Sequence, residues 1–274
     1  MTTSVISVAA RPRRKSTATL AIHQFRYDLR ALLRNRQAQF FTLILPVLFL
    51  VIFASIFGGH GKTVAVAGGQ LNSSVSYVPG IMTLGIIAAA FINLVISVTA
   101  QRETGILKRR RATPIPAIAL IAGRALTSVV IATTTTAVLI GIGWAAYGAD
   151  VPARTAPALA ATVVVGTLSF CCLGFAVASM IHDHDAAQPV TQAIMLPQYF
   201  ISGVFVAAST LPHWLLDVAD VFPVRHLAAA LLTAYNPHTR GDGLAPTDLL
   251  IIAGWGAAGL GVALRRFSWQ PHRR

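Results

Sequence analysis

Long apolar runs, separated by short polar or basic segments, make up most of this chain. Residues 17–36 show a helical period, in which apolar residues recur at alternating four- and three-residue steps and basic residues take the opposite side. The apolar positions are Ala18, Ile22, Phe25, Leu29 and Leu32, and the other side carries His23, Arg26, Arg30 and Arg34. The pattern predicts an amphipathic helix in the plane of a membrane surface, acting as an anchor or as a docking element.

Six longer runs have the length, about 20 apolar residues, that a membrane-spanning helix needs. The predicted spans cover residues 37–61, 77–100, 117–147, 155–182, 188–206 and 247–264. Arg124 lies in the first turns of the third span. We interpret it as a side chain that snorkels to the interface, with a charge in a transport pathway as the alternative. A polar loop is predicted over residues 58–76.

The uncharged run over residues 186–216 is too long for one straight span. Its 31 residues would form a helix of about 46 Å, against a hydrocarbon core of about 30 Å. Pro197, Gly203 and Pro212 supply breaks. We therefore expect the fifth span to be followed by short interfacial or re-entrant helices over residues 211–219 and 224–234.

Six spans place both termini on one side of the membrane. Eighteen of the 22 Lys and Arg residues then lie on that side, and Lys62, Arg154, Arg225 and Arg240 lie on the other. Basic residues favour the cytoplasmic side. The predicted fold is an all-α integral membrane protein with cytoplasmic termini. Its parts are a disordered basic segment (1–16), the amphipathic helix (17–36), a six-span transmembrane domain (37–266) and a basic tail (267–274).

The composition agrees with a membrane protein, because 55% of the residues are hydrophobic and 11% are charged, with a mean hydropathy of +0.66. A soluble domain carries about 25% charged residues. The net charge of +13 does not indicate a nucleic-acid partner, since the basic residues lie at the ends of apolar runs. Membrane lipids are the expected surroundings.

Several kinds of chemistry are absent from the sequence. No segment matches the full phosphate-loop pattern G-x-x-x-x-G-K-S/T, and no span has an acidic residue in its middle, which argues against an ion-coupled carrier. The acids are scattered, which argues against a membrane transferase. The run His182-Asp183-His184-Asp185 could ligate a metal, but adjacent residues on a helix point apart. We interpret it as a solvated turn and predict no metal and no catalytic residue.

The charged segment over residues 102–116, RETGILKRRRATPIP, holds five basic residues and Glu103, the chain's only glutamate. Basic residues alone would satisfy membrane topology. Glu103, Gly105, Pro114 and Pro116 go beyond that and suggest a shaped docking surface. A chain that moves something without its own energy source needs a partner, and this segment is the predicted contact. The candidate coupling residues in it are Arg102, Glu103, Thr104, Gly105, Lys108, Arg109 and Arg111.

These residues resemble a pattern, R-E-x-G-x-L-K-R-x-R-A-T-P, of the permease subunits of type-2 ABC exporters, in particular the daunorubicin-resistance-like drug efflux group. Further matching pieces are Tyr77-Val78-Pro79-Gly80, the run PQYFISGVF over residues 197–205, LPHWL over 211–215 and FPVRHL over 222–227. The resemblance covers nearly all of the chain from about Phe25. Arg110, where a leucine is common, and the charged run His182–Asp185 depart from it.

The resemblance implies a subunit that pairs with a second copy, or with a related permease, and with two ABC ATPase subunits. ATP and Mg would be bound by those ATPases, and this chain would hold no cofactor. It implies that the amphipathic helix, with Phe25, Arg26 and Arg30, and the loop after the second span contact the ATPases. It also implies that spans one, two and five face the translocation path, in a bacterial inner (cytoplasmic) membrane.

The cargo is expected to be amphipathic or hydrophobic, because the spans contain no charged pocket. Candidate path residues are Asn93, Gln192, Gln198, Tyr199 and Phe200, although polar side chains in spans also bond between helices. Three alternatives stay open: an exporter of polysaccharide or lipid-linked glycan, a self-contained channel or secondary carrier, and a membrane transferase.

Overall fold

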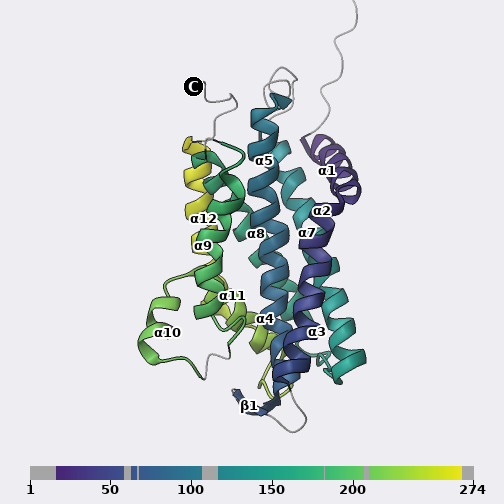
Figure 1. Cartoon of the computed structure of the whole chain (residues 1–274), viewed down its shortest axis with the longest axis vertical. Coiled ribbons are helices and arrows are strands. Elements are labelled where there is room, and N and C mark those ends of the chain that lie inside the picture. The colour runs from purple at the N-terminus through teal and green to yellow at the C-terminus, as the bar shows by residue number, and fades with distance from the viewer. Residues whose placement is uncertain are drawn as a thin grey trace, which may run out of the picture.

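Most helices run lengthwise in one bundle in the computed structural model of the chain (Figure 1). It describes residues 17–58, 63–66, 68–106, 117–181, 183–206 and 210–266. The first half contains α1 (Thr17–Arg34), α2 (Arg36–Gln39), the π-helical turn η1 (Phe40–Ile44), α3 (Leu45–Phe57), α4 (Ser73–Ile87), the π-helical turn η2 (Ala88–Ile92) and α5 (Asn93–Glu103). The second half contains α7 (Ala117–Tyr147), α8 (Ala156–Met180), α9 (Ala187–Ile201), α10 (His213–Ala219), α11 (Pro223–Tyr235) and α12 (Pro246–Arg266).

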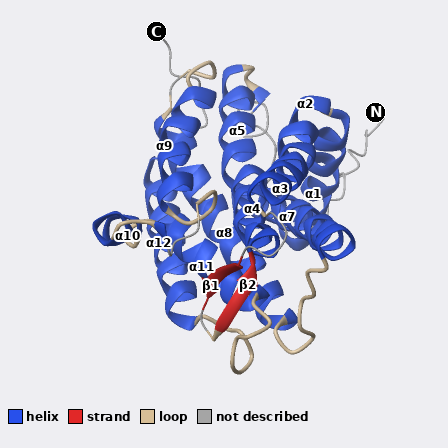
Figure 2. Ribbon diagram, turned by 60° about the horizontal axis from the view of Figure 1, so that its bottom comes forward, coloured by secondary structure: helices blue, strands red, loops and turns tan. Residues whose placement is uncertain are grey.

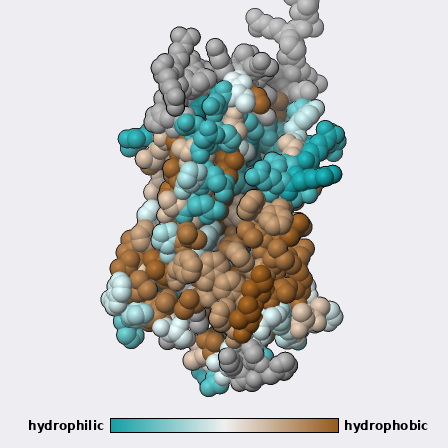
Figure 3. All heavy atoms as spheres, viewed as in Figure 1, coloured by the Kyte–Doolittle hydropathy of each residue, from teal (hydrophilic) through white to brown (hydrophobic). Residues whose placement is uncertain are grey.

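Five helices within the described ranges are long and apolar enough to cross a membrane. They are Arg36–Phe57, Ser73–Glu103, Ile121–Tyr147, Ala156–Met180 and Pro246–Arg266, at the positions of predicted spans one to four and six. Figure 3 shows apolar side chains gathered over the part of the surface around α3, and polar side chains toward the end that carries α1. The chain is therefore a helical, multi-pass membrane protein.

The predicted fifth span corresponds to α9, a helix of 15 residues. Such a helix is about 22 Å long, shorter than a hydrocarbon core of about 30 Å. It ends at Ile201 rather than at residue 206, because the chain turns through Ser202 and Gly203, whose φ is +85°. Glycine adopts that left-handed conformation without a steric penalty. The predicted break at Gly203 is thus confirmed, and α10 and α11 follow close to the predicted places.

The second long helix, formed by α4, η2 and α5, is the centre of the bundle, and most of its side chains are buried. Hydroxyl groups of α7 bond to backbone carbonyls in the two π-helical turns. Ser128 donates to the carbonyl of Ala89 (3.3 Å) and Thr135 donates to that of Thr42 (3.4 Å). Single π-helical turns interrupt the regular hydrogen-bond ladder and are frequent at functional sites. Here both turns face one groove, which is described below.

A two-stranded hairpin lies within the segment that was predicted as a polar loop (Figure 2). Strands β1 (Thr63–Val66) and β2 (Gly69–Asn72) are antiparallel, with Thr63 opposite Asn72. Close to it, the Arg154 side chain donates to the carbonyls of Pro237 (2.8 Å) and Thr239 (2.7 Å). The hairpin covers only eight residues, and the described chain is otherwise built from helices, as the all-α prediction expects. We call this end of the bundle the hairpin end.

The opposite end carries α1 and the last turn of α12 (Figure 1), and we call it the basic end. Described basic residues concentrate there: Arg26, Arg30, Arg34, Arg36, Arg102, Arg124, Arg265 and Arg266. Because α1 and the last turn of α12 share this end, the chain between them crosses the bundle an even number of times.

Helix α1 packs against the start of α7 through a buried ion pair. Arg124 Nε lies 3.3 Å from Asp28 Oδ2, and the two side chains are only 11% and 9% exposed. Arg124 also donates through Nη1 to the hydroxyl of Ser97 on α5. The interpretation of Arg124 as a snorkelling side chain is therefore wrong, because the residue joins three helices in the interior.

Candidate translocation groove

A groove of about 1530 Å³ follows the bundle from the basic end toward the hairpin end. Its walls come from α1 and α2, η1 and α3, the central helix, the first half of α7, and α9 with the turn that follows it. Pockets for drug-sized ligands usually measure about 300–1,000 Å³. The groove is therefore large enough for a bulky or extended molecule.

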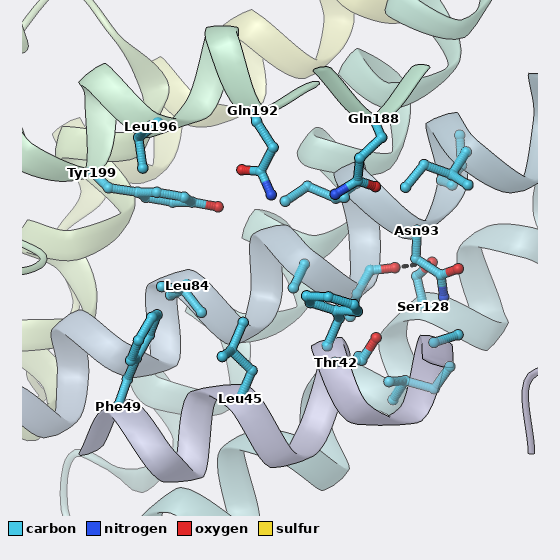
Figure 4. Close-up of a pocket in the computed structure, with 18 of the residues that line it drawn as sticks. Thr42, Leu45, Phe49, Leu84, Asn93, Ser128, Gln188, Gln192, Leu196 and Tyr199 are labelled. Carbon is cyan, nitrogen blue, oxygen red and sulfur yellow. Dashed lines mark hydrogen bonds between the residues drawn. The ribbon is translucent and has the colours of Figure 1, made fainter. Parts of the chain in front are cut away.

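The inner half of the groove, toward the basic end, is polar. The charged side chains among its described lining residues are Asp28, Arg124 and Asp185. Farther along, uncharged polar side chains face each other across the groove (Figure 4): Thr42, Asn93, Ser128, Gln188 and Gln192. A molecule at this level would meet hydrogen-bonding groups and no net charge.

The outer half of the groove, toward the hairpin end, is aromatic and is centred on Phe205. The Phe205 ring stacks on Phe53 with a centroid distance of 5.3 Å, and it contacts Phe49 at 5.8 Å. Tyr199 and Phe200 of α9 approach the same ring at 6.0 and 5.3 Å. These five residues, with Tyr77 and Phe57 beside them, form what we call the aromatic cluster. The cluster thus joins α3 to α9 across the outer half of the groove.

Four of the five predicted path residues line the groove: Asn93, Gln192, Tyr199 and Phe200. Tyr199 is only 4% exposed, yet its hydroxyl has no hydrogen-bond partner among the described residues and points into the groove (Figure 4). Gln198 is not among the lining residues. Its amide nitrogen donates to the carbonyl of Ile194 in its own helix (2.9 Å).

The sequence contains a further signal for the groove. Large apolar residues recur every four positions along the first span, and all of them line the groove: Phe41, Leu45, Phe49, Phe53 and Phe57. An apolar stripe on a helix more often packs into a protein core than lines a transport path. The residue types alone therefore do not distinguish a core face from a path-lining face. The turn that carries Phe205 could not be placed from periodicity, because it belongs to no regular element.

The predicted coupling residues that the structure describes lie at the basic end. Arg26, Arg30, Glu103 and Thr104 are exposed, and Phe25 is half-buried. Gly105 has a φ of +70° just beyond α5. Arg102 is buried. Lys108, Arg109 and Arg111 lie outside the described residues.

A smaller pocket of about 420 Å³ lies beside these residues, between the end of α5 and the turn before α9. It is lined by Ala100, Glu103, Thr104, His184 and Asp185. His182 lies outside the described residues, and the parts of the chain that the structure covers contain no group of three or more His, Cys, Asp or Glu side chains placed to hold a metal ion.

Gly80 of α4 allows the turn after α9 to approach the central helix. A β-carbon on Gly80 would lie 2.5 Å from the carbonyl oxygen of Val204. We therefore expect Gly80→Ala to displace this turn, and Phe205 with it, and to destabilise the protein by about 1–3 kcal/mol. Gly141→Ala is the matched control, because a β-carbon there meets nothing within 4 Å. The measurement is the midpoint of thermal unfolding in detergent for both variants. Equal midpoints for Gly80→Ala and Gly141→Ala would contradict the prediction.

The fold is thus a bundle of membrane-length helices around a lengthwise groove, an arrangement that membrane transport proteins use. A sequence profile of the ABC-2 type transporter family matches residues 22–235. The chain belongs to this family, and the resemblance seen in the charged segment is thereby confirmed.

Two relatives are similar to the chain. The daunorubicin resistance ABC transporter permease protein DrrB1 of Streptomyces coeruleorubidus is 25% identical over 83% of this chain and 78% of its own length. The probable multidrug ABC transporter permease YbhR of Escherichia coli K12 is 25% identical over 54% of this chain and 40% of its own length. Family membership and these relatives identify the chain as a permease of an ABC transporter, which implies association with an ABC ATPase subunit.

Proposed function

We propose that this chain is the membrane-spanning subunit of an ATP-driven exporter that moves an amphipathic or hydrophobic compound out of the cell. The observation that carries the proposal is the groove, whose polar inner half and aromatic outer half suit a molecule with both polar and apolar parts. The names of the two relatives, which refer to daunorubicin resistance and to multidrug transport, support a drug or antibiotic as the cargo. A lipid-like cargo would suit the same groove.

In the proposed topology the basic end faces the cytoplasm, in agreement with the preference of basic residues for that side. Helix α9 and the turn after it make the sixth crossing, so both termini are cytoplasmic. Helices α10 and α11 are then short re-entrant or interfacial helices on the outer side. A bacterial cytoplasmic membrane fits a chain whose two relatives are bacterial permeases.

The proposed complex contains two copies of the chain, or this chain and a related permease, with two ATPase subunits that bind ATP and Mg. Helix α1 and the end of α5 form the contact with the ATPases. Both elements also line the groove, through Asp28 in α1 and Ala100 and Gln101 in α5. Movement of the ATPases would thus change the inner mouth of the groove, while the aromatic cluster holds the outer end closed until it is separated.

Glu103→Ala tests the proposed contact at the end of α5. The carboxylate is exposed, so its loss should not disturb membrane insertion, whereas it would remove the acidic partner of a basic residue on the ATPase. An interfacial charge pair of this kind contributes about 1.5–7 kcal/mol in measured cases, so we expect transport to fall at least about tenfold. Transport into inside-out vesicles, compared with Asp217→Ala at the exposed face of α10, would measure this fall. Normal transport by the correctly inserted Glu103→Ala protein would contradict the assignment.

The size of the groove favours one alternative cargo, a polysaccharide or lipid-linked glycan, because its volume exceeds that of an ordinary drug pocket. Stimulation of ATP hydrolysis by the reconstituted complex distinguishes the two classes. We expect aromatic amphiphiles to stimulate hydrolysis in a saturable manner and glycans not to do so. Stimulation by glycans alone would assign the groove to the alternative cargo.

A further inference from the structure

The sequence groups Arg102 with the other basic residues of the charged segment, but the structure buries its side chain. We infer that Arg102 is a positioning residue, which clamps the end of α5 to the end of α8 and thereby carries movement of the coupling segment to the inner mouth of the groove. The inference rests on the proposed function and deepens it. It concerns how force reaches the groove within this chain, after the ATPase has supplied it.

The first observation is the burial and bonding of the Arg102 side chain. The residue is only 4% exposed. Its Nη1 donates to the carbonyl of Ala178 (3.0 Å) and its Nη2 to the carbonyl of Ile181. Helix α8 ends at Met180, and Ile181 is extended, with a ψ of 127°. The last carbonyls of a helix lack intrahelical partners, and a cation placed there is favourable. The guanidinium therefore caps α8.

The second observation is what lies directly beyond the capped end. The chain turns after Ile181 into α9, and His184 and Asp185 of that turn line both the groove and the smaller pocket beside Glu103. Thr99, one turn before Arg102, has its hydroxyl 3.5 Å from Nδ1 of His184. Two side chains of α5 thus hold the end of α8 and the start of the α9 turn. These elements form a continuous unit at the inner mouth.

The third observation is the direction of the neighbouring side chain. Successive residues of an α-helix point about 100° apart. Arg102 accordingly points inward while Glu103 is exposed on the surface of the same turn. Force applied to Glu103 by a partner reaches α8 through the adjacent Arg102. Lysine would not replace this arginine fully, since the two bonds use the planar fork of a guanidinium and an ammonium group has no such fork.

The experiment uses the full permease with its ATPase in proteoliposomes, with Gln188→Cys as a reporter at the groove mouth. Gln188 lines the groove and is exposed. The rate of maleimide labelling is measured with and without ATP, and labelling of the chain without the reporter is subtracted because Cys171 and Cys172 are free thiols. ATP hydrolysis and co-purification of the ATPase are measured in the same preparations.

We expect Arg102→Gln to retain the ATPase and its hydrolysis, and to reduce the ATP-dependent change in labelling about tenfold, as the loss of two charge-assisted hydrogen bonds allows. Arg102→Lys should give an intermediate change, and Thr99→Val a smaller one in the same direction. If Arg102 only stabilised the fold, Arg102→Gln would lower the yield of protein. The protein that remains would then show ATP hydrolysis and an ATP-dependent labelling change in the native proportion.

Two results would overturn the inference while the proposed function stands. One is an ATP-dependent labelling response of normal size in Arg102→Gln, or in Arg102→Lys if the glutamine variant does not accumulate in the membrane. The other is loss of ATPase co-purification in Arg102→Gln, which would make Arg102 a contact residue for the partner. If the chain with native Arg102 shows neither an ATPase complex nor an ATP response, the proposed function itself fails.

Discussion

Asp28→Ala is expected to release α1 from the bundle and to reduce ATP-driven transport to less than about a tenth of its normal rate. The substitution would leave the guanidinium of Arg124 in the interior without its carboxylate, where both side chains of the pair are about nine-tenths buried. Removing one partner of a buried ion pair costs about 3–5 kcal/mol. Because Gln24 is the only residue of α1 that is fully buried, the ion pair is one of the few interior contacts of this helix.

Thiol labelling measures the release directly. Gln24→Cys is a suitable reporter, because Gln24 is only 8% exposed and its side chain lies against Gly123 at the start of α7. We expect maleimide to label this cysteine slowly in the otherwise native chain and in the control Asp217→Ala, and far faster in Asp28→Ala. The exchange Asp28→Arg with Arg124→Asp should restore part of the protection. Unchanged labelling and transport in Asp28→Ala would show that the ion pair does not hold α1.

Phe205→Ala is expected to open the outer end of the groove. The ring contacts four other aromatic side chains, and each such pair contributes about 0.5–1.5 kcal/mol beyond the area that it buries. Without the ring, α3 and the turn after α9 lose their main connection. We expect cargo trapped in vesicles to leak without ATP at least about tenfold faster than through the native protein.

Leakage from preloaded vesicles, in the absence of ATP, checks this expectation. Phe40→Ala is the matched control, because Phe40 is exposed on the first long helix and does not line the groove. Phe205→Leu should leak less than Phe205→Ala, since leucine fills part of the same space. Equal leak rates for Phe205→Ala and Phe40→Ala would mean that the aromatic cluster does not close the groove.

The sequence was sufficient to predict most of the helices. A helix that crosses a bilayer needs about 20 apolar residues, and basic residues gather at the cytoplasmic ends of such helices. The predicted helices over residues 211–219 and 224–234 correspond to α10 (His213–Ala219) and α11 (Pro223–Tyr235). The hairpin was missed because each strand has only four residues. The two π-helical turns were missed because the apolar pattern of a span does not record where its hydrogen-bond ladder is interrupted.

The candidate site was predicted less well, because it depends on which face each helix turns toward its neighbours. Gln188, Gln192, Leu196 and Phe200 recur every four residues and share the groove face of α9, whereas Gln198 falls between these positions. The helical period could have excluded it. The partners of Arg102 and Arg124 could not be predicted from the sequence, since Ala178, Ile181 and Asp28 lie far from them along the chain.

The most direct test of the central claim is cargo transport by the purified chain in proteoliposomes, with and without its ABC ATPase. A fluorescent aromatic amphiphile serves as the cargo. We predict ATP-dependent accumulation in inside-out vesicles that contain both subunits, and none in vesicles that contain the permease alone or the ATPase alone. Transport of the same size by the chain alone, without ATP, would contradict the account and identify a self-contained channel or carrier.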